Sequence, residues 1–194
     1  MKRVVFGAVV TGVLVWQSAT FTQAPKPPVI ATDIPAAEVK AVLDAPSAIA
    51  DRLITAVDMG TYNVGVGVLR RTPTKPGAPV GAINHEHITE VYYIISGTGT
   101  LLTGGTVTNP RAVAADSEIV KVVVGPSNQG TFDKPAQRRK VGPGDVVVIP
   151  PGVYHGFDEV TTGIDYLAVR PDPNKVLPAG YLHPSVQAFR AKPQ

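Results

Sequence analysis

"GDVVVIPPGVYHGF", residues 144–157, joins a short β-branched run to a Pro-Pro-Gly turn and then to a segment that begins at Tyr154 and His155. Runs of Val and Ile that are bounded by Gly and Pro predict strands, and proline and glycine together predict a tight turn. The segment therefore predicts two strands joined by a turn, with a histidine at the start of the second strand.

The same pattern of short β-branched runs separated by turn residues extends over most of the chain. From residue 51 to residue 170, short β-branched runs alternate with Gly, Pro, Asn and Asp, and about ten of them are strand candidates. They include RLITAVDM (52–59), HEHI (85–88), EVYYIIS (90–96), EIVKVVVG (118–125) and IDYLAVR (164–170). No helices alternate with these runs and no internal repeat is visible, so the pattern predicts one all-β barrel or sandwich.

The barrel is flanked by segments of different character. Residues 25–50 form a proline-rich spacer followed by TDIPAAEVKAVLDA, which predicts one short helix with Thr32 or Asp33 as N-cap. Residues 171–194 form a proline-rich C-terminal tail that either lies across the barrel or reaches a partner subunit.

Residues 1–24 have the layout of a secretory signal peptide. Lys2 and Arg3 precede an apolar run that ends at Trp16, and small and polar residues follow up to Ala24. The alternative is an uncleaved N-terminal anchor. Either interpretation predicts that the folded part is exported, to the periplasm or to the extracellular space.

Composition excludes several classes of protein. The formal charge of +3 falls to +1 without residues 1–24, because Lys2 and Arg3 are lost and no acid is lost with them. No basic face for nucleic acid is present, and QRRK at 137–140 is the densest basic cluster. The chain has no cysteine, so disulfides and thiolate metal ligands are excluded.

Histidines concentrate in two segments. The chain has four, and three of them lie in NHEHITEVYYIISGTG (84–99) and in 144–157. On a regular strand His85 and His87 point to the same face, where their imidazoles form a pair of nitrogen donors. With His155 as a third donor and Glu90 as a carboxylate, the pattern predicts a metal site.

The two segments resemble the two motifs of the cupins, small jelly-roll barrels (double-stranded β-helices) that bind one metal ion. In the second motif the spacing of Gly144, Pro150, Gly152 and His155 is matched closely, although Glu159 replaces the asparagine expected at its end. In the first motif, Glu90 and Gly97 match, but two residues separate His87 from Glu90 where the family usually has three or four. The resemblance covers residues from about 50 to 170 and implies a single-domain cupin barrel with a short N-terminal helix.

The short spacing allows two registers for the first motif. In one, His85, His87, Glu90 and His155 all bind the metal and the turn before Glu90 is tighter. In the other, His85 takes the place of the second motif histidine, Ile83 replaces the first, and His87 is spare. We favour the first, because shortening a turn by one residue changes the backbone little whereas Ile83 removes a ligand. If the turn aims Glu90 elsewhere, three histidines and water remain.

These ligands suit one transition metal ion, with Fe or Cu favoured and Mn, Ni or Zn as alternatives. The resemblance implies a metalloenzyme, and an exported oxidoreductase of the dioxygenase or oxidase type acting on a small phenolic or a carbohydrate is our leading hypothesis. Glu90 would ligate the metal or act as base, and Tyr92 would position the substrate or pack in the core. The alternatives are a redox-neutral isomerase or lyase and a non-catalytic module that binds a sugar or another small ligand.

Three further features carry expectations. The long segment 98–143 is expected to form loops over the barrel mouth. In YNVGVGVLRR, Gly65 and Gly67 alternate with valines and no helix follows, which excludes a phosphate loop and indicates a close approach by another strand. A homodimer through sheet edges is expected, because open barrels leave edges that need cover.

Overall fold

The computed structural model describes residues 26, 28 and 30–192, so the predicted signal peptide lies outside the described residues. The elements in chain order are α1 (Ala36–Leu43), β1 (Asp51–Asp58), β2 (Asn63–Arg71), β3 (Gly81–His85), β4 (Glu90–Gly97), β5 (Gly99–Ala112), the π-helix η1 (Ile119–Val123), β6 (Ser127–Val141), β7 (Val146–Ile149), β8 (His155–Asp158), β9 (Ile164–Asp172) and α2 (Pro184–Arg190). The all-β prediction with a short N-terminal helix is confirmed. Among the described residues, no helix is both long and apolar enough to cross a bilayer.

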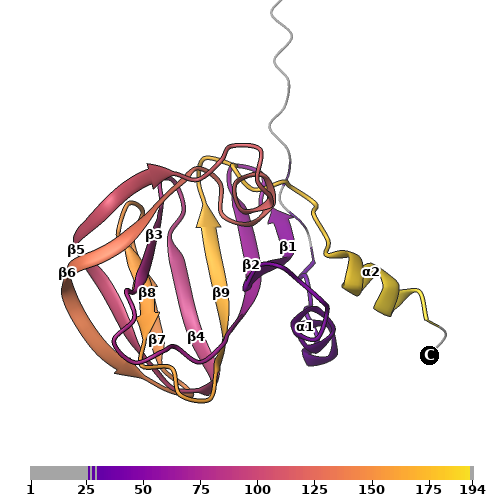
Figure 1. Ribbon diagram of the computed structural model, residues 1–194. Helices are drawn as coiled ribbons and strands as arrows, with labels where there is room; N and C mark the ends of the chain where they lie inside the picture. The colour runs from indigo at the N-terminus through magenta and orange to yellow at the C-terminus, as the bar shows by residue number, and fades with distance from the viewer. Residues whose placement is uncertain (1–25, 27, 29, 193–194) are drawn as a thin grey trace, which may run out of the picture.

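Two antiparallel sheets face one another (Figure 1). One sheet has the strand order β1-β2-β9-β4-β7, and the other contains β3, β6, β5 and β8. Neighbours in a sheet come from distant parts of the sequence, as where β4 pairs with both β7 and β9. This is the jelly-roll barrel that the sequence predicts.

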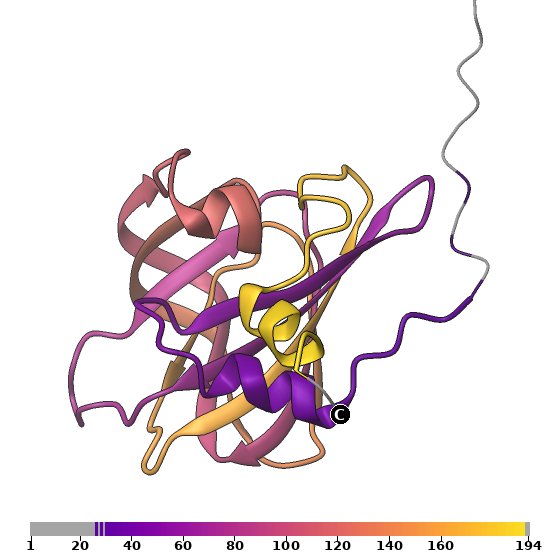
Figure 2. The ribbon, with the colours of Figure 1, turned by 90° about the vertical axis from the view of Figure 1, so that its right-hand side faces the viewer.

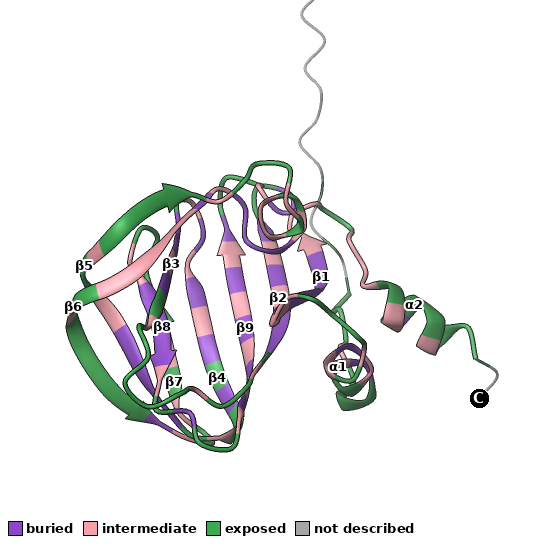
Figure 3. Cartoon of the chain, viewed as in Figure 1, coloured by how far each residue is buried: buried purple, intermediate pink, exposed green. Residues whose placement is uncertain are grey.

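The core lies between the two sheets. Every second residue of β9 is buried, beginning with Ile164 and Tyr166, and Figure 3 shows the resulting alternation along this strand. The ring of Tyr166 lies 4.6 Å from that of Tyr92 on β4 and 5.3 Å from that of Phe157 on β8. Packed aromatic rings therefore join the two sheets.

The two helices pack side by side on the outer face of the larger sheet, over β1 and β2 (Figures 1 and 2). Val42 of α1 and Val186 of α2 share an apolar cluster with Ile54 of β1. The prediction of Thr32 or Asp33 as N-cap is wrong: Pro35 takes this position with φ −61° and ψ 150°, an extended conformation that the proline ring permits.

The tail covers the free edge of β1. The amide of Ala56 donates to the Tyr181 carbonyl at 3.1 Å, and the amide of His183 donates to the Ile54 carbonyl at 2.8 Å. Edge strands left bare invite pairing with other chains. Of the two roles expected for the tail, the structure therefore shows the tail lying against its own barrel.

Two sequence predictions for the segment 98–143 are wrong. EIVKVVVG contains the π-helix η1 and no strand, because Val123 and Val124 bury their side chains against Leu53 and Ile88 without joining a sheet. Most of the remainder forms the long hairpin of β5 and β6, which takes the place of the expected loops.

Candidate metal centre

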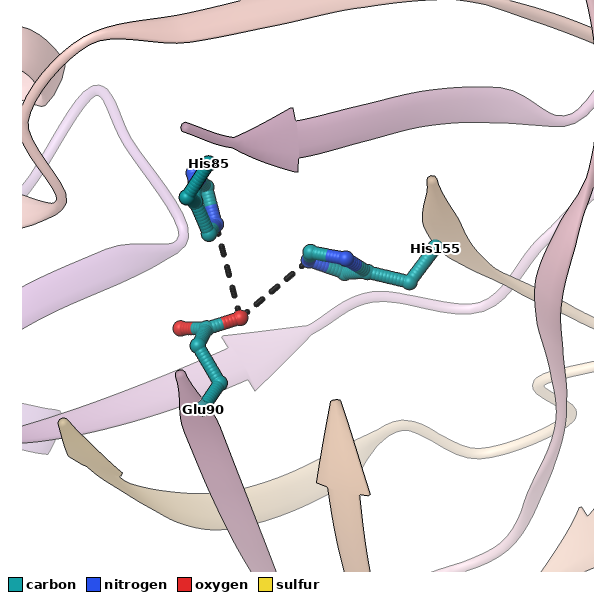
Figure 4. A group of neighbouring side chains, drawn as sticks. All are labelled: His85, Glu90 and His155. Carbon is teal, nitrogen blue, oxygen red and sulfur yellow. Dashed lines mark ion pairs between the residues drawn. The ribbon is translucent and has the colours of Figure 1, made fainter. Parts of the chain in front are cut away.

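Three side chains from three strands converge inside the barrel (Figure 4). His85 ends β3, Glu90 begins β4 and His155 begins β8. Oε2 of Glu90 lies 3.4 Å from Nε2 of His85 and 3.2 Å from Nε2 of His155. All three residues are buried.

The Pro-Pro-Gly turn places His155 beside His85. Gly152 in this turn has φ +77°, a conformation that glycine adopts without strain, and its amide donates to the His85 carbonyl at 2.8 Å. One residue pair, Ile83 and His155, then joins β3 to β8. The turn predicted from the sequence thus connects the two motifs directly.

Hydrogen bonds fix which nitrogen of each imidazole carries the proton. Nδ1 of His155 lies 3.0 Å from the Val153 carbonyl, which can only accept. Nδ1 of His85 lies 2.8 Å from the Ser127 hydroxyl, which itself donates to the Gly125 carbonyl at 2.8 Å and so accepts from the ring. In the neutral form of each ring, Nε2 therefore carries the lone pair and faces the Glu90 carboxylate.

Three acceptor atoms that face one another suit a bound cation. Lone pairs of two neutral imidazoles and one carboxylate repel unless positive charge lies between them, and these are donors that transition metals accept. The ligand atoms all lie within 4.8 Å of one another. The group formed by His85, Glu90 and His155 can therefore hold a metal ion.

A buried arginine holds Glu90 in its charged form. Nε of Arg170 donates to Oε1 of Glu90 at 2.9 Å, and its Nη2 donates to Oδ2 of Asp51 at 2.5 Å. Burial alone would raise the pKa of Glu90, but the positive charge of Arg170 holds this pKa well below its usual range. Glu90 thus keeps its charge at neutral pH.

The neighbouring groups keep their neutral forms. Burial lowers the pKa of His85, so this ring stays unprotonated near neutral pH. Burial and the nearby Glu90 carboxylate raise the pKa of Tyr92 well above its usual value. The Tyr92 hydroxyl keeps its proton and donates it to Oε2 of Glu90 at 2.7 Å.

A cavity of about 330 Å³ adjoins the three ligand candidates. His85, His155 and Tyr92 contribute to its wall. The rest of the wall is largely apolar, with Asp51, Arg71 and Gln129 as further polar members. A small molecule in this cavity would contact the metal-binding group directly.

Comparison with known proteins identifies the family. The cupin family profile matches residues 48–174, which is more than half of the chain. The chain belongs to the cupin family. No curated protein sequence matches this cupin.

Several solved structures resemble this cupin at low sequence identity. The protein BH2720 from Bacillus halodurans is 13% identical with a TM-score of 0.47, and the match covers 86% of this chain and 100% of that one. The DMSP lyase DddQ from Ruegeria pomeroyi is 17% identical with a TM-score of 0.41, over 69% of this chain and 50% of that one. KdgF from Halomonas sp. is 12% identical with a TM-score of 0.39, over 63% and 78% of the two chains.

The structure does not bring His87 to the other three residues. β3 ends at His85, and residues 86–87 form a bend, so the strand alternation that would align the two histidines does not apply. The His87 side chain is 40% exposed, and its Nε2 lies 4.0 Å from Oε2 of Glu86. This arrangement corresponds to the register that we did not favour, in which Ile83 replaces a ligand and four residues separate His85 from Glu90.

Other polar residues outside the metal-binding group have structural roles in this cupin. Arg70 forms an ion pair with Asp165 outside the cavity, and Asn84 donates to the Gly152 carbonyl. His183, the fourth histidine of the chain, caps α2 by accepting from the Ser185 amide.

Sequence reasoning missed the residues that support Glu90. Arg170 follows Tyr166 and Ala168 on the buried face of β9, and a charged residue in that alternation was the available signal. The space beside Gly67 is occupied by the Arg170 side chain and by the Arg52 carbonyl of β1, so the close approach predicted here involves a side chain as well as a strand. A Cβ atom at Gly67 would lie 2.3 Å from Nη1 of Arg170.

Proposed function

We propose that this cupin is a metal-dependent enzyme whose ion is held by His85, Glu90 and His155, and that it is an Fe(II)-dependent oxidoreductase of small molecules. The observation that supports this proposal is the convergence of two imidazole lone pairs and one carboxylate oxygen beside a cavity. Two histidines and one carboxylate are the ligand set of non-haem Fe(II) oxygenases, which keep further coordination positions open.

The chain's own groups would prepare this site before an ion binds. The Ser127 hydroxyl and the Val153 carbonyl orient the two imidazoles, and Arg170 keeps Glu90 ionised. A bound Fe(II) ion would supply the redox chemistry. Tyr92, whose hydroxyl keeps its proton, would donate a hydrogen bond to Glu90 or to a substrate in the cavity.

Redox-neutral catalysis is the second candidate function. Two histidines and one glutamate also hold catalytic zinc with an open position. Tyr92 lies in the cavity wall with its hydroxyl protonated, so it could donate a hydrogen bond to the substrate of an isomerase or a lyase. Turnover without oxygen would distinguish this reaction class from oxidation.

Metal analysis of the mature protein tests the proposal. The protein is purified without added metal, reconstituted anaerobically with Fe(II), and its metal content is measured by mass spectrometry. We expect near-stoichiometric iron in the wild type and loss of most of it in His85→Ala and His155→Ala. The matched control is His87→Ala, which removes an imidazole of the same motif outside the buried group and should retain the metal.

Oxygen consumption by the reconstituted protein then decides between the candidates. Uptake of oxygen with small phenolics, carboxylates or sugars as substrates supports the oxidoreductase. Zinc or manganese in the purified protein, with activity that is indifferent to oxygen, favours the redox-neutral enzyme. A wild-type protein that binds no metal after reconstitution refutes the metalloenzyme and leaves a module that binds a small ligand.

We also propose that the protein is exported, on the basis of the signal-peptide layout of residues 1–24. N-terminal sequencing of protein from the secreted and periplasmic fractions should find a chain that begins near Pro25.

A homodimer is a further expectation, which the molar mass of the mature protein in solution tests directly.

A further inference from the structure

Arg71 is a charged member of the cavity wall that the proposed metal chemistry does not use. It is the last residue of β2 and is half-buried. Its Nε donates to the Tyr166 hydroxyl at 2.8 Å, and its guanidinium carbon lies 5.5 Å from the centre of the Phe157 ring. These two contacts hold the guanidinium in place from one side.

The terminal nitrogens of this guanidinium are available for a ligand. Within residues 26, 28 and 30–192, neither Nη1 nor Nη2 of Arg71 has a hydrogen-bond or ion-pair partner. A guanidinium with both terminal groups available matches a carboxylate, which can accept two parallel hydrogen bonds. By contrast, Arg70 next to it uses Nε and Nη2 on Asp165.

Arg71 differs from the other charged groups around the cavity in having no ion-pair partner. Arg71 and Arg170 carry two positive charges, and Asp51 and Glu90 carry two negative charges, so the four groups cancel. Both carboxylates pair with Arg170, and no carboxylate of the described chain lies within ion-pair distance of Arg71. A divalent cation at His85 would add positive charge and strengthen the attraction for an anion.

The size and lining of the cavity restrict the rest of the ligand. About 330 Å³ is near the lower end for small-molecule sites, which excludes a polymer from the interior. Ile83, Ile119 and Val124 line the cavity and would contact an apolar or aromatic body.

We infer that the substrate is a small carboxylic acid with an apolar or aromatic body, whose carboxylate binds Arg71 while its body lies beside the metal-binding group. The claim that this acid is the substrate rests on the proposed function, but binding of the acid to Arg71 requires no metal. It narrows the substrate class from phenolics or carbohydrates to carboxylates.

Ligand binding to the mature protein tests this inference. Acetate, benzoate and cinnamate are compared with acetamide, benzamide and cinnamamide by saturation-transfer NMR and calorimetry, on metal-free and on Zn(II)-loaded protein. We expect benzoate or cinnamate to bind the metal-free protein at least tenfold more tightly than its amide. Arg71→Gln should weaken binding of the acid at least tenfold and leave binding of the amide unchanged.

Two further variants make the test specific. Arg70→Gln removes a neighbouring charge outside the cavity and should leave acid binding within twofold of wild type. Arg71→Lys keeps the positive charge but cannot form the bidentate hydrogen bonds of a guanidinium, so it should bind the acid with intermediate affinity. This variant provides a second measurement if Arg71→Gln is unstable.

The outcomes separate this inference from the proposed function. No preference for any acid over its amide, or equal acid affinity in wild type and the Arg71 variants, overturns the inference even if the protein binds metal. Acid binding that depends on Arg71 in a protein that binds no metal supports the inference and refutes the metalloenzyme.

Discussion

Replacing Arg170 with methionine leaves two carboxylates inside the barrel without their guanidinium. Arg170 is fully buried and pairs with Glu90, which is 1% exposed, and with Asp51. Removing one partner from a buried ion pair costs roughly 3–5 kcal/mol, because the remaining charge is uncompensated. At about 2–4 °C per kcal/mol for a chain of this size, the melting temperature of the metal-free protein should fall by about 6–20 °C.

Thermal and urea unfolding of the metal-free protein measure this cost, with Arg70→Met as the matched control. Arg70 is 45% exposed in its ion pair with Asp165, so the same substitution there should cost no more than about 1 kcal/mol. Adding Asp51→Asn and Glu90→Gln to Arg170→Met should restore much of the lost stability, since no unpaired charge remains. Equal losses from Arg170→Met and Arg70→Met would refute the reasoning.

Four further predictions concern the centre and its surroundings. Ser127→Ala should weaken metal binding about 10–100-fold in a metal titration, because the hydroxyl orients the His85 ring. Gly67→Ala should cost about 1–3 kcal/mol by urea unfolding through contact with the buried guanidinium, whereas Gly81→Ala, with open space around it, should not. The metal-free protein should lose stability as the pH falls below about 6.5, because the unfolded His85 takes up a proton there while burial lowers the pKa of the folded residue; a melting temperature constant from pH 8 to 5 would contradict this. Ile83→His should tighten metal binding at least tenfold by adding a fourth ligand from the cavity wall, and an unchanged dissociation constant would show that position 83 does not reach the ion.

Local patterns in the sequence predicted the barrel and most of its strands. Strands and turns of this kind are specified by residues that are close together in the sequence. The Pro-Pro-Gly turn before His155 is one example. The prediction of a strand over residues 118–125 was wrong because tertiary packing of Val123 and Val124 outweighed the β propensity of the run.

The candidate site was predicted less completely, for a related reason. The alternation that would align His85 with His87 holds only inside a strand, and the last residue of β3 is His85. The last residue of a strand is decided by its pairing with other strands. Here the pairing of β3 with β6 ends at His85 and Ser127. The pairing between distant strands therefore decides which histidine enters the interior.

The residue that replaces the expected motif asparagine illustrates the same limit. Glu159 has φ +51°, a left-handed conformation that asparagine adopts more readily than glutamate. Its side chain accepts from the Thr100 hydroxyl at 2.5 Å, so a contact across the sheet accompanies the less favourable backbone. The spacing of the motif revealed the substitution, but only the fold reveals this contact.

The arrangement of charges implies that this barrel folds before it binds metal. Glu90 is paired with Arg170, and the two imidazoles are oriented by hydrogen bonds from Nδ1 to Ser127 and Val153, so only the two Nε2 lone pairs lack a partner without an ion. Apolar clusters between the sheets and under the helices supply the core independently of the site. A structural zinc domain, by contrast, unfolds when its metal is removed. The group of His85, Glu90 and His155 is therefore formed before any ion binds, which is what the proposed catalytic site requires.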